Sequence, residues 1–106
     1  MLLEQDLPND AAARAFQALY FAACALLDAA GETRPADPSA AISLFGFRFV
    51  KIGGMDLRHY QSLRRAYELH RLCECKADRD ATAAEATELI GAAELLLTEA
   101  AERLAA

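Results

Sequence analysis

Tryptophan is absent from this 106-residue sequence, and proline, cysteine and glycine number only three, three and five. Valine and isoleucine, which favour strands, are also scarce, whereas the helix formers alanine and leucine dominate the apolar content. No apolar run approaches the ~20 residues of a membrane span, and the acidic N-terminus is too poor in apolar residues for a secretory signal. These absences argue against a β-rich fold and a membrane protein, and they predict a cytoplasmic location.

The three cysteines, Cys24, Cys73 and Cys75, suit a reducing compartment better than a disulfide framework. On a helix, Cys73 and Cys75 would point about 200° apart, so they cannot clamp one metal ion. His70 shares a helix face with Cys73, but two ligands fall short of the four that a structural zinc needs. We therefore expect no metal site and no cofactor.

Apolar side chains recur at three- and four-residue steps in four segments, which indicates amphipathic helices. The hydrophobic fraction of 55 % is sufficient for one core, so residues 1–106 are predicted to form a single domain. The expected helices cover about 10–30, 38–52, 56–77 and 82–104, with breaks near 31–37, 52–56 and 78–82. Four such helices joined by short loops predict an all-α, up-and-down four-helix bundle.

Residues that cap helices mark the expected helix starts: Asn9 with Asp10, Asp37 before Pro38, Asp56, and Thr82 with Glu85. A proline fits directly after a cap because its missing N–H falls where no helical hydrogen bond is due. Thr82 and Glu85 have the spacing of a capping box, in which each side chain satisfies a free backbone N–H. The fourth helix is expected to bury one face, comprising Ala86, Leu89, Ile90, Ala93, Leu96, Leu97, Ala100 and Leu104.

Charge is unevenly distributed along the chain. The net charge is −5, yet residues 48–79 hold eight basic and four acidic side chains, a local balance of +4 against −9 elsewhere. A basic segment in an acidic protein favours contact with phosphate or an acidic partner, and the alternative is that it neutralises the protein's own acidic helices. The candidate phosphate- or nucleic-acid-binding residues are Arg64, Arg71, Lys76 and Arg79.

The expected third helix carries polar residues on its apolar side. His59, His70 and Glu74 lie near the centre of the apolar face, whereas the basic residues occupy the opposite arc as a solvated or ligand-facing strip. Buried polar groups need partners, so His70 and Glu74, one turn apart, are expected to be largely buried and paired. The pair is either a structural contact or part of a catalytic site, with Glu74 orienting a general acid or base at His70 and Arg65 holding a phosphate.

The segments 14–27, 42–46 and 49–53 together resemble the HEPN family of helical domains. Residues 14–27 read RAFQALYFAACALL, close to a first-helix signature that reads approximately R-A-Y-Y-A-M-F-H-A-A-R-A-L-L. Residues 42–46 (ISLFG) and 49–53 (FVKIG) resemble the family segment I-x-L-F-G … F-V-K-T-G, and the acidic last helix follows in the expected order. The resemblance implies a helical bundle that is commonly a homodimer and often acts beside a minimal nucleotidyltransferase, in toxin–antitoxin settings.

Many members of that family are metal-independent ribonucleases that use an R-x(4–6)-H pair at the dimer interface. Residues 65–70 match R-x4-H literally, which makes Arg65 and His70 the candidate catalytic pair, with RNA as the implied substrate. Other family positions depart from the pattern: Phe21 replaces the usual first-helix His, and Glu74 replaces an Arg. Two functions therefore stand: a catalytically degenerate, dimerising module that binds a partner or nucleotide, and an active ribonuclease.

Overall fold

This computed structural model describes residues 2–74 and 80–105 of the chain. Its elements are α1 (Leu2–Ala29), α2 (Pro38–Phe45), the π-helix η1 (Gly46–Ile52), α3 (Leu57–Glu74) and α4 (Ala83–Ala105). No strand occurs within these described ranges, and the predicted all-α four-helix bundle is confirmed. The predicted third helix extends to about residue 77, but residues 75–79 lie outside the described part of the chain.

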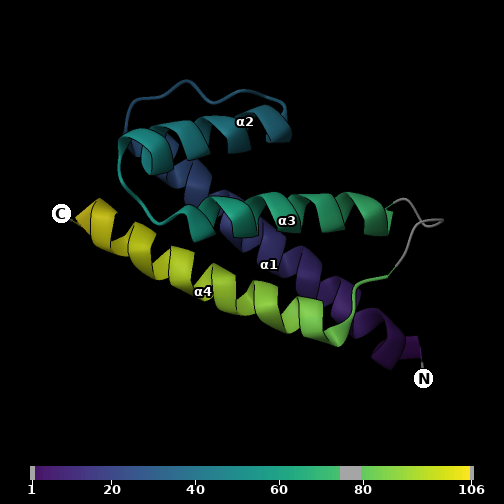
Figure 1. Ribbon diagram of the computed structural model, residues 1–106. Helices are drawn as coiled ribbons and strands as arrows, with labels where there is room; N and C mark the ends of the chain where they lie inside the picture. The colour runs from purple at the N-terminus through teal and green to yellow at the C-terminus, as the bar shows by residue number, and fades with distance from the viewer. Residues whose placement is uncertain (1, 75–79, 106) are drawn as a thin grey trace.

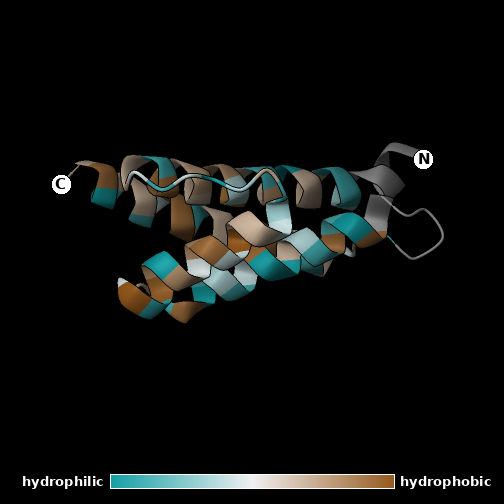
Figure 2. Cartoon of the chain, turned by 90° about the horizontal axis from the view of Figure 1, so that it is seen from above, coloured by the Kyte–Doolittle hydropathy of each residue, from teal (hydrophilic) through white to brown (hydrophobic). Residues whose placement is uncertain are grey.

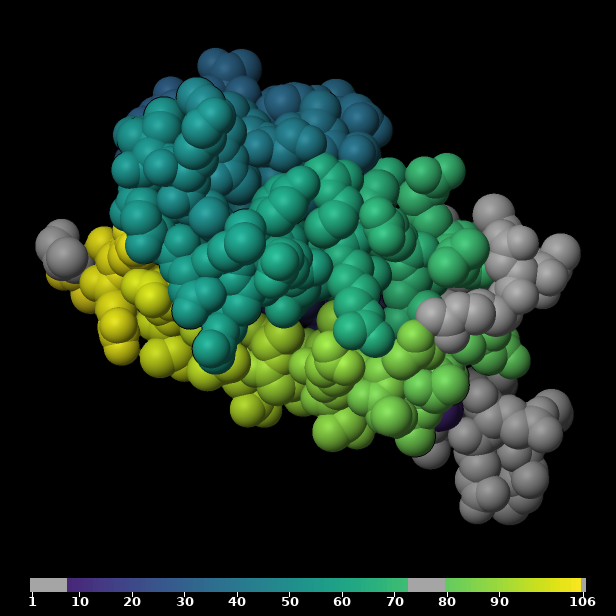
Figure 3. Space-filling model, in the orientation of Figure 1, coloured from purple at the N-terminus to yellow at the C-terminus, as the bar shows by residue number. Residues whose placement is uncertain are grey.

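The loop 30–37 sets the direction in which α2 runs relative to α1. Figure 1 shows α1, α2 and α4 running in one direction along the bundle and α3 running in the opposite direction. Residues 30–37 carry the chain back along the outside of the bundle, as Figure 2 also shows, so α2 lies parallel to α1. Up-and-down alternation therefore begins at α2 and continues through α3 and α4. The result is an elongated molecule of 46 × 25 × 18 Å, whose outline Figure 3 shows in the orientation of Figure 1.

The core lies where α1 packs against α4, which is the most extensive contact between helices, and where α2 and α3 close over α1. In Figure 2, hydrophobic and hydrophilic stretches alternate along each helix, as expected for helices with one buried face. Alanines at the α1–α4 contact allow the two backbones to approach closely. The largest fully buried side chains are Leu19, Leu27, Ile42, Phe45, Leu63 and Leu96.

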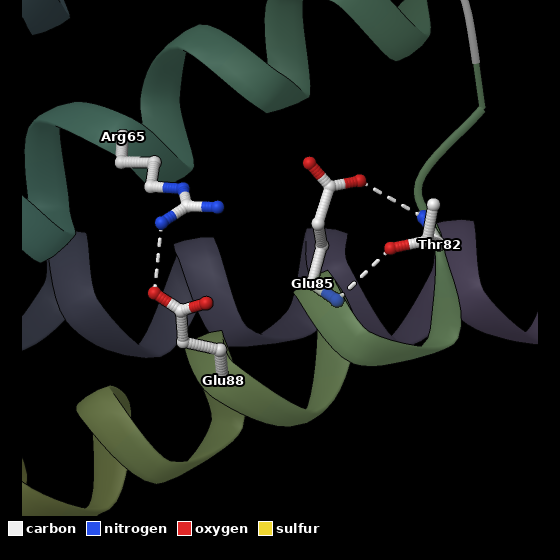
Figure 4. Close-up of polar contacts among 4 residues, drawn as sticks. All are labelled: Arg65, Thr82, Glu85 and Glu88. Atoms are coloured by element: carbon white, nitrogen blue, oxygen red, sulfur yellow. Dashed lines mark hydrogen bonds and ion pairs between the residues drawn. The ribbon is translucent and has the colours of Figure 1, made fainter.

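Three of the four predicted helix starts are confirmed. The Asp37 carboxylate accepts a hydrogen bond from the Ala40 amide at 3.2 Å, and Asp56 accepts one from the Arg58 amide at 2.9 Å. Thr82 and Glu85 form the predicted capping box: the Thr82 amide donates to Glu85 Oε1 at 3.0 Å, and the Glu85 amide donates to Thr82 Oγ1 at 3.1 Å. Figure 4 shows this reciprocal pair at the start of α4.

The predicted start of the first helix is wrong, because α1 begins at Leu2 and contains Pro8. Asn9 therefore lies inside α1, and its side chain binds the segment that precedes α4 instead of capping a helix. Asn9 Oδ1 accepts a hydrogen bond from the Ala81 amide at 2.6 Å, and its Nδ2 donates to Asp80 at 3.0 Å. One side chain thus fixes the start of α4 beside the first turns of α1.

The predicted second helix changes its winding halfway, because residues 46–52 form η1 rather than a continuation of α2. The glycine at this change lies against α3: a Cβ on Gly46 would lie 2.5 Å from Cδ1 of Tyr60. A side chain there would force the Tyr60 ring or the η1 backbone to shift. The predicted stop is confirmed at Gly54, whose φ of +73° favours glycine.

The expected apolar face of α4 is only partly buried. Ala86, Leu89, Ala93, Leu96 and Ala100 are in the core as predicted. Three large members of the same expected face, Ile90, Leu97 and Leu104, are exposed instead. Ile90 and Leu97 lie at one edge of the apolar arc, whereas Leu104 lies at the same helical angle as the buried Ala86 but close to the end of α4.

Candidate functional site

Arg65, the first half of the candidate catalytic pair, lies on the side of α3 that faces α4. Its Nη1 lies 2.8 Å from Oε1 of Glu88, and Figure 4 shows the guanidinium pointing from α3 to α4. Both side chains are more than half exposed, so the pair contributes at most about 1 kcal/mol to stability. The carboxylate nevertheless neutralises the charge that a bound phosphate would otherwise attract.

His70, the second half of the pair, faces α1. Its ring stacks on Phe16 with centroids 5.0 Å apart and an interplanar angle of 21°. The side chain is partly buried. Five residues of helix place Arg65 and His70 about 140° apart around α3, so the two side chains contact different neighbouring helices. The expected partner, Glu74, has a side chain outside the described residues.

Arg64 corrects the prediction of a solvated basic strip. Its guanidinium donates hydrogen bonds to Ser39 Oγ at 2.8 Å, to the Ser39 carbonyl at 3.3 Å and to Ser43 Oγ at 2.8 Å. The same group lies 5.6 Å from the ring centroid of Tyr60. These contacts join α3 to α2, so Arg64 serves as a structural link, with three of its five N–H donors engaged.

Of the other candidate phosphate ligands, Arg71 lies on the described surface and two lie outside the described residues. Arg71 is exposed, and its guanidinium lies 5.9 Å from the ring centroid of Tyr67. Lys76 and Arg79 lie outside the described residues. The described candidates therefore do not converge on one point: Arg64 contacts α2, Arg65 contacts α4, and Arg71 lies over its own helix.

His59 is the polar residue that the structure buries most clearly, with 7 % of its surface exposed, as its position on the apolar face indicated. Burial lowers the pKa of its imidazole, and the nearby Glu99 and Asp56 carboxylates partly oppose that effect. The ring borders a polar cavity of about 290 Å³ between the start of α3 and the end of α4. The neutral form of His59 is therefore favoured in the folded chain.

A cavity of about 390 Å³ opens between α1 and the loop 30–37, and sequence reasoning missed it. Tyr20, Phe21 and the buried thiol of Cys24 line it from α1, and Arg34 closes it from the loop. Burial, followed by the neighbouring Cys24, raises the pKa of Tyr20, and interaction with Cys24 raises the pKa of Arg34. The spacing of Tyr20 and Cys24 signals a shared helix face, but the approach of Arg34 depends on a loop path that no pattern predicts.

Neither a candidate metal site nor a candidate membrane span is found in the described ranges. Over residues 2–74 and 80–105, no three His, Cys, Asp or Glu side chains are grouped so that they could hold a metal ion. None of the described helices offers a stretch that is both long and apolar enough to cross a bilayer. No family model, curated protein or solved structure matches the chain.

Proposed function

We propose that this chain is a self-associating, catalytically degenerate helical module of the HEPN type, acting in the cytoplasm with a nucleotidyltransferase-type or toxin–antitoxin partner. The observation that supports degeneracy most directly is the separation of the candidate pair: Arg65 is ion-paired with Glu88, whereas His70 packs on Phe16. The nature of the partner rests on the sequence resemblance, and the self-association rests on exposed apolar side chains of α4.

Cleavage of RNA without a metal requires a general acid or base and a cation at the same phosphate. In this chain the Arg65 guanidinium is already neutralised by Glu88, and the His70 imidazole packs on Phe16 of α1. Two family positions have also lost their usual chemistry, with Phe21 in place of a His and Glu74 in place of an Arg. These features together favour binding of a protein or nucleotide over catalysis.

A second candidate function, metal-independent ribonuclease activity, is favoured by one observation. Arg65 and Arg71 are exposed and His70 is half-buried, so all three retain accessible surface on α3. A second copy docked near this surface would be able to complete a site across the interface. In that arrangement Arg65 would break its ion pair with Glu88 and would hold the scissile phosphate instead.

One assay separates the two functions. Purified protein is incubated with total RNA in the presence of a chelator, and cleavage is followed on a denaturing gel for wild type and His70→Ala. The proposal predicts intact RNA with both proteins, at concentrations where the wild type self-associates. Cleavage by wild type that is lost in His70→Ala would establish the ribonuclease instead.

A further inference from the structure

Three large apolar side chains form an exposed row along α4. Ile90, Leu97 and Leu104 are 41 %, 43 % and 48 % exposed, and seven residues separate each from the next. Seven residues turn a helix almost twice, so the three side chains lie within about 40° of one another. Such a row differs from singly scattered apolar residues, which are normal on a protein surface.

The row lies on the edge of α4 that faces away from α3. The opposite edge of α4 contacts α3 through the ion pair of Glu88 with Arg65. Glu88 and Leu97 are nine residues apart, which places them about 180° apart around the helix axis. Because α1, α3 and α4 all pack against one another, this edge borders the outer face of the α1–α4 pair.

α1 contributes a row of small side chains to the same face. Ala11, Ala18 and Ala25 are half-buried, are also spaced by seven residues, and lie on the edge opposite Phe16, which contacts α3. The outer face of the α1–α4 pair is therefore bordered by alanines on one helix and by Ile and Leu on the other. The rows themselves are apolar, and each is flanked by one exposed charged residue: Arg14 lies one turn from Ala11 and Ala18, and Glu94 lies one turn from Ile90 and Leu97.

The two rows lie at matching heights along the bundle. α1 and α4 run in the same direction (Figure 1), and the hydrogen bond from the Ala81 amide to Asn9 sets their relative position. A residue of α1 is thereby level, within about one turn, with the residue 72 positions later in α4. This offset, taken from positions 9 and 81, places Ala18 level with Ile90 and Ala25 level with Leu97.

We propose that the outer face of the α1–α4 pair, bordered by Ala11, Ala18, Ala25, Ile90, Leu97 and Leu104, binds a second copy of this chain. The two-fold axis runs along the helices, so α4 of each copy lies over α1 of the other. In this arrangement Ile90 and Leu97 of one copy meet Ala18 and Ala25 of its partner at the same height. An axis across the helices would instead set Leu97 and Ile90 against the large side chains of the other α4. The inference rests on the self-association in the proposed function and specifies where it occurs.

The size of the face is adequate for a weak but specific dimer. Residues 11–29 of α1 span about 28 Å, and two helices packed side by side are about 20 Å wide. The flat face is then about 560 Å² per copy, close to the lower limit of about 1,200 Å² in total for specific interfaces. Both copies carry a net charge of −5, so the apolar rows, which add no charge of their own, supply the contact against this repulsion.

The test compares two leucines of α4, Leu95 and Leu97, that are similarly exposed but lie about 160° apart around the helix. Sedimentation equilibrium is measured for wild type, Leu97→Glu and the matched control Leu95→Glu, with circular dichroism to confirm that each is helical. Leu95 is 50 % exposed, so a charge at either position is tolerated in the folded monomer. We expect the dissociation constant to rise about 100-fold or more in Leu97→Glu and to stay unchanged in Leu95→Glu.

Mixing two variants tests the axis. Ala25→Lys and Leu97→Glu should each weaken the homodimer. In a heterodimer of the two variants, one of the two symmetry-related contacts pairs the new lysine with the new glutamate, and the other contact is the native pair of Ala25 with Leu97. The mixture should therefore form heterodimers at concentrations where each variant alone is monomeric. A mixture that stays monomeric would overturn the axis along the helices.

The outcomes distinguish the inference from the function on which it rests. A wild-type protein that is monomeric at 100 µM (on the order of the weakest specific dimers) would overturn both the self-association and this interface. A dimeric wild type whose association is unchanged in Leu97→Glu would overturn this interface alone. Equal weakening by Leu95→Glu would also overturn it, because the association would then not depend on which face carries the charge.

Discussion

The two sides of α3 differ in how they contact their neighbours. Toward α2, Arg64 donates three hydrogen bonds and Tyr60 lies directly against Gly46, where no side chain would fit. Toward α4, the adjacent Arg65 forms one exposed ion pair with Glu88. Two arginines that are neighbours in the sequence therefore have unequal roles. The comparison shows why a basic helix is not by itself a phosphate site: its charges are distributed among contacts with different helices.

The largest effect is expected from Gly46→Ala on the α2 side. The new Cβ would lie 2.5 Å from Tyr60 Cδ1, so the aromatic ring or the η1 backbone must shift. We expect a loss of about 2–3 kcal/mol in the free energy of unfolding, measured by urea denaturation. Gly91→Ala in α4 is the matched control, because its Cβ meets nothing within 4 Å, and it should stabilise the protein by about 0.5–1 kcal/mol. Equal effects of the two substitutions would show that the close approach at Gly46 is not tight.

Arg64→Ala should have the next largest effect. The substitution removes three hydrogen bonds and leaves Ser39 and Ser43 without their charged donor. We expect the free energy of unfolding to fall by about 1.5–2 kcal/mol, with Arg64→Lys recovering only part of it because an ammonium cannot reproduce the forked geometry. Urea denaturation at fixed ionic strength measures both. A loss under about 0.5 kcal/mol would mean that α2 does not depend on this link.

Arg65→Ala, on the α4 side, should barely change stability. The Arg65–Glu88 pair is exposed, so we expect a change of about 0.5 kcal/mol or less that diminishes further in 0.5 M salt (an ionic strength of the order that screens surface pairs). The double variant with Glu88→Gln completes the cycle and isolates the pair. If Arg65→Ala lowered the free energy of unfolding as much as Arg64→Ala does, the two sides of α3 would not differ in the way described.

His59 should make the α4 side sensitive to acid. Burial lowers the pKa of His59 in the folded chain, so the unfolded chain binds a proton first as the pH falls through about 6.5. The folded state therefore loses stability over this range, and the loss stops growing once the pH falls below the folded pKa. His59→Gln should reduce the slope of stability against pH between about 7 and 5, measured by thermal unfolding. An unchanged slope would show that His59 does not contribute to the acid sensitivity.

The fold was more predictable than the site, for physical reasons. Helix starts depend on local rules, so the Asp37, Asp56 and Thr82 caps were predictable from a few neighbouring residues. The direction of α2 depends on the path of the loop 30–37, which no local pattern encodes. The partner of each arginine depends on which helix packs beside it, so periodicity placed Arg64 on the polar arc without revealing its bonds to Ser39 and Ser43.

The exposed face of α4 shows the same limit. Periodicity placed Ile90, Leu97 and Leu104 on the apolar arc correctly, but it does not state how much of that arc one neighbouring helix covers. The arc is wider than the contact with α1, so its edge is exposed. An apolar pattern wider than the observed contact is itself a signal of a second contact.

The central claim is that Arg65 and His70 do not act on a common phosphate. The most direct measurement is a double-mutant cycle for binding of a short RNA, with Arg65→Gln, His70→Gln and the double variant compared with wild type by fluorescence anisotropy at fixed salt. The account predicts additive effects, with a coupling energy under about 0.5 kcal/mol. A coupling energy above about 1 kcal/mol would contradict it and would place both side chains in one site.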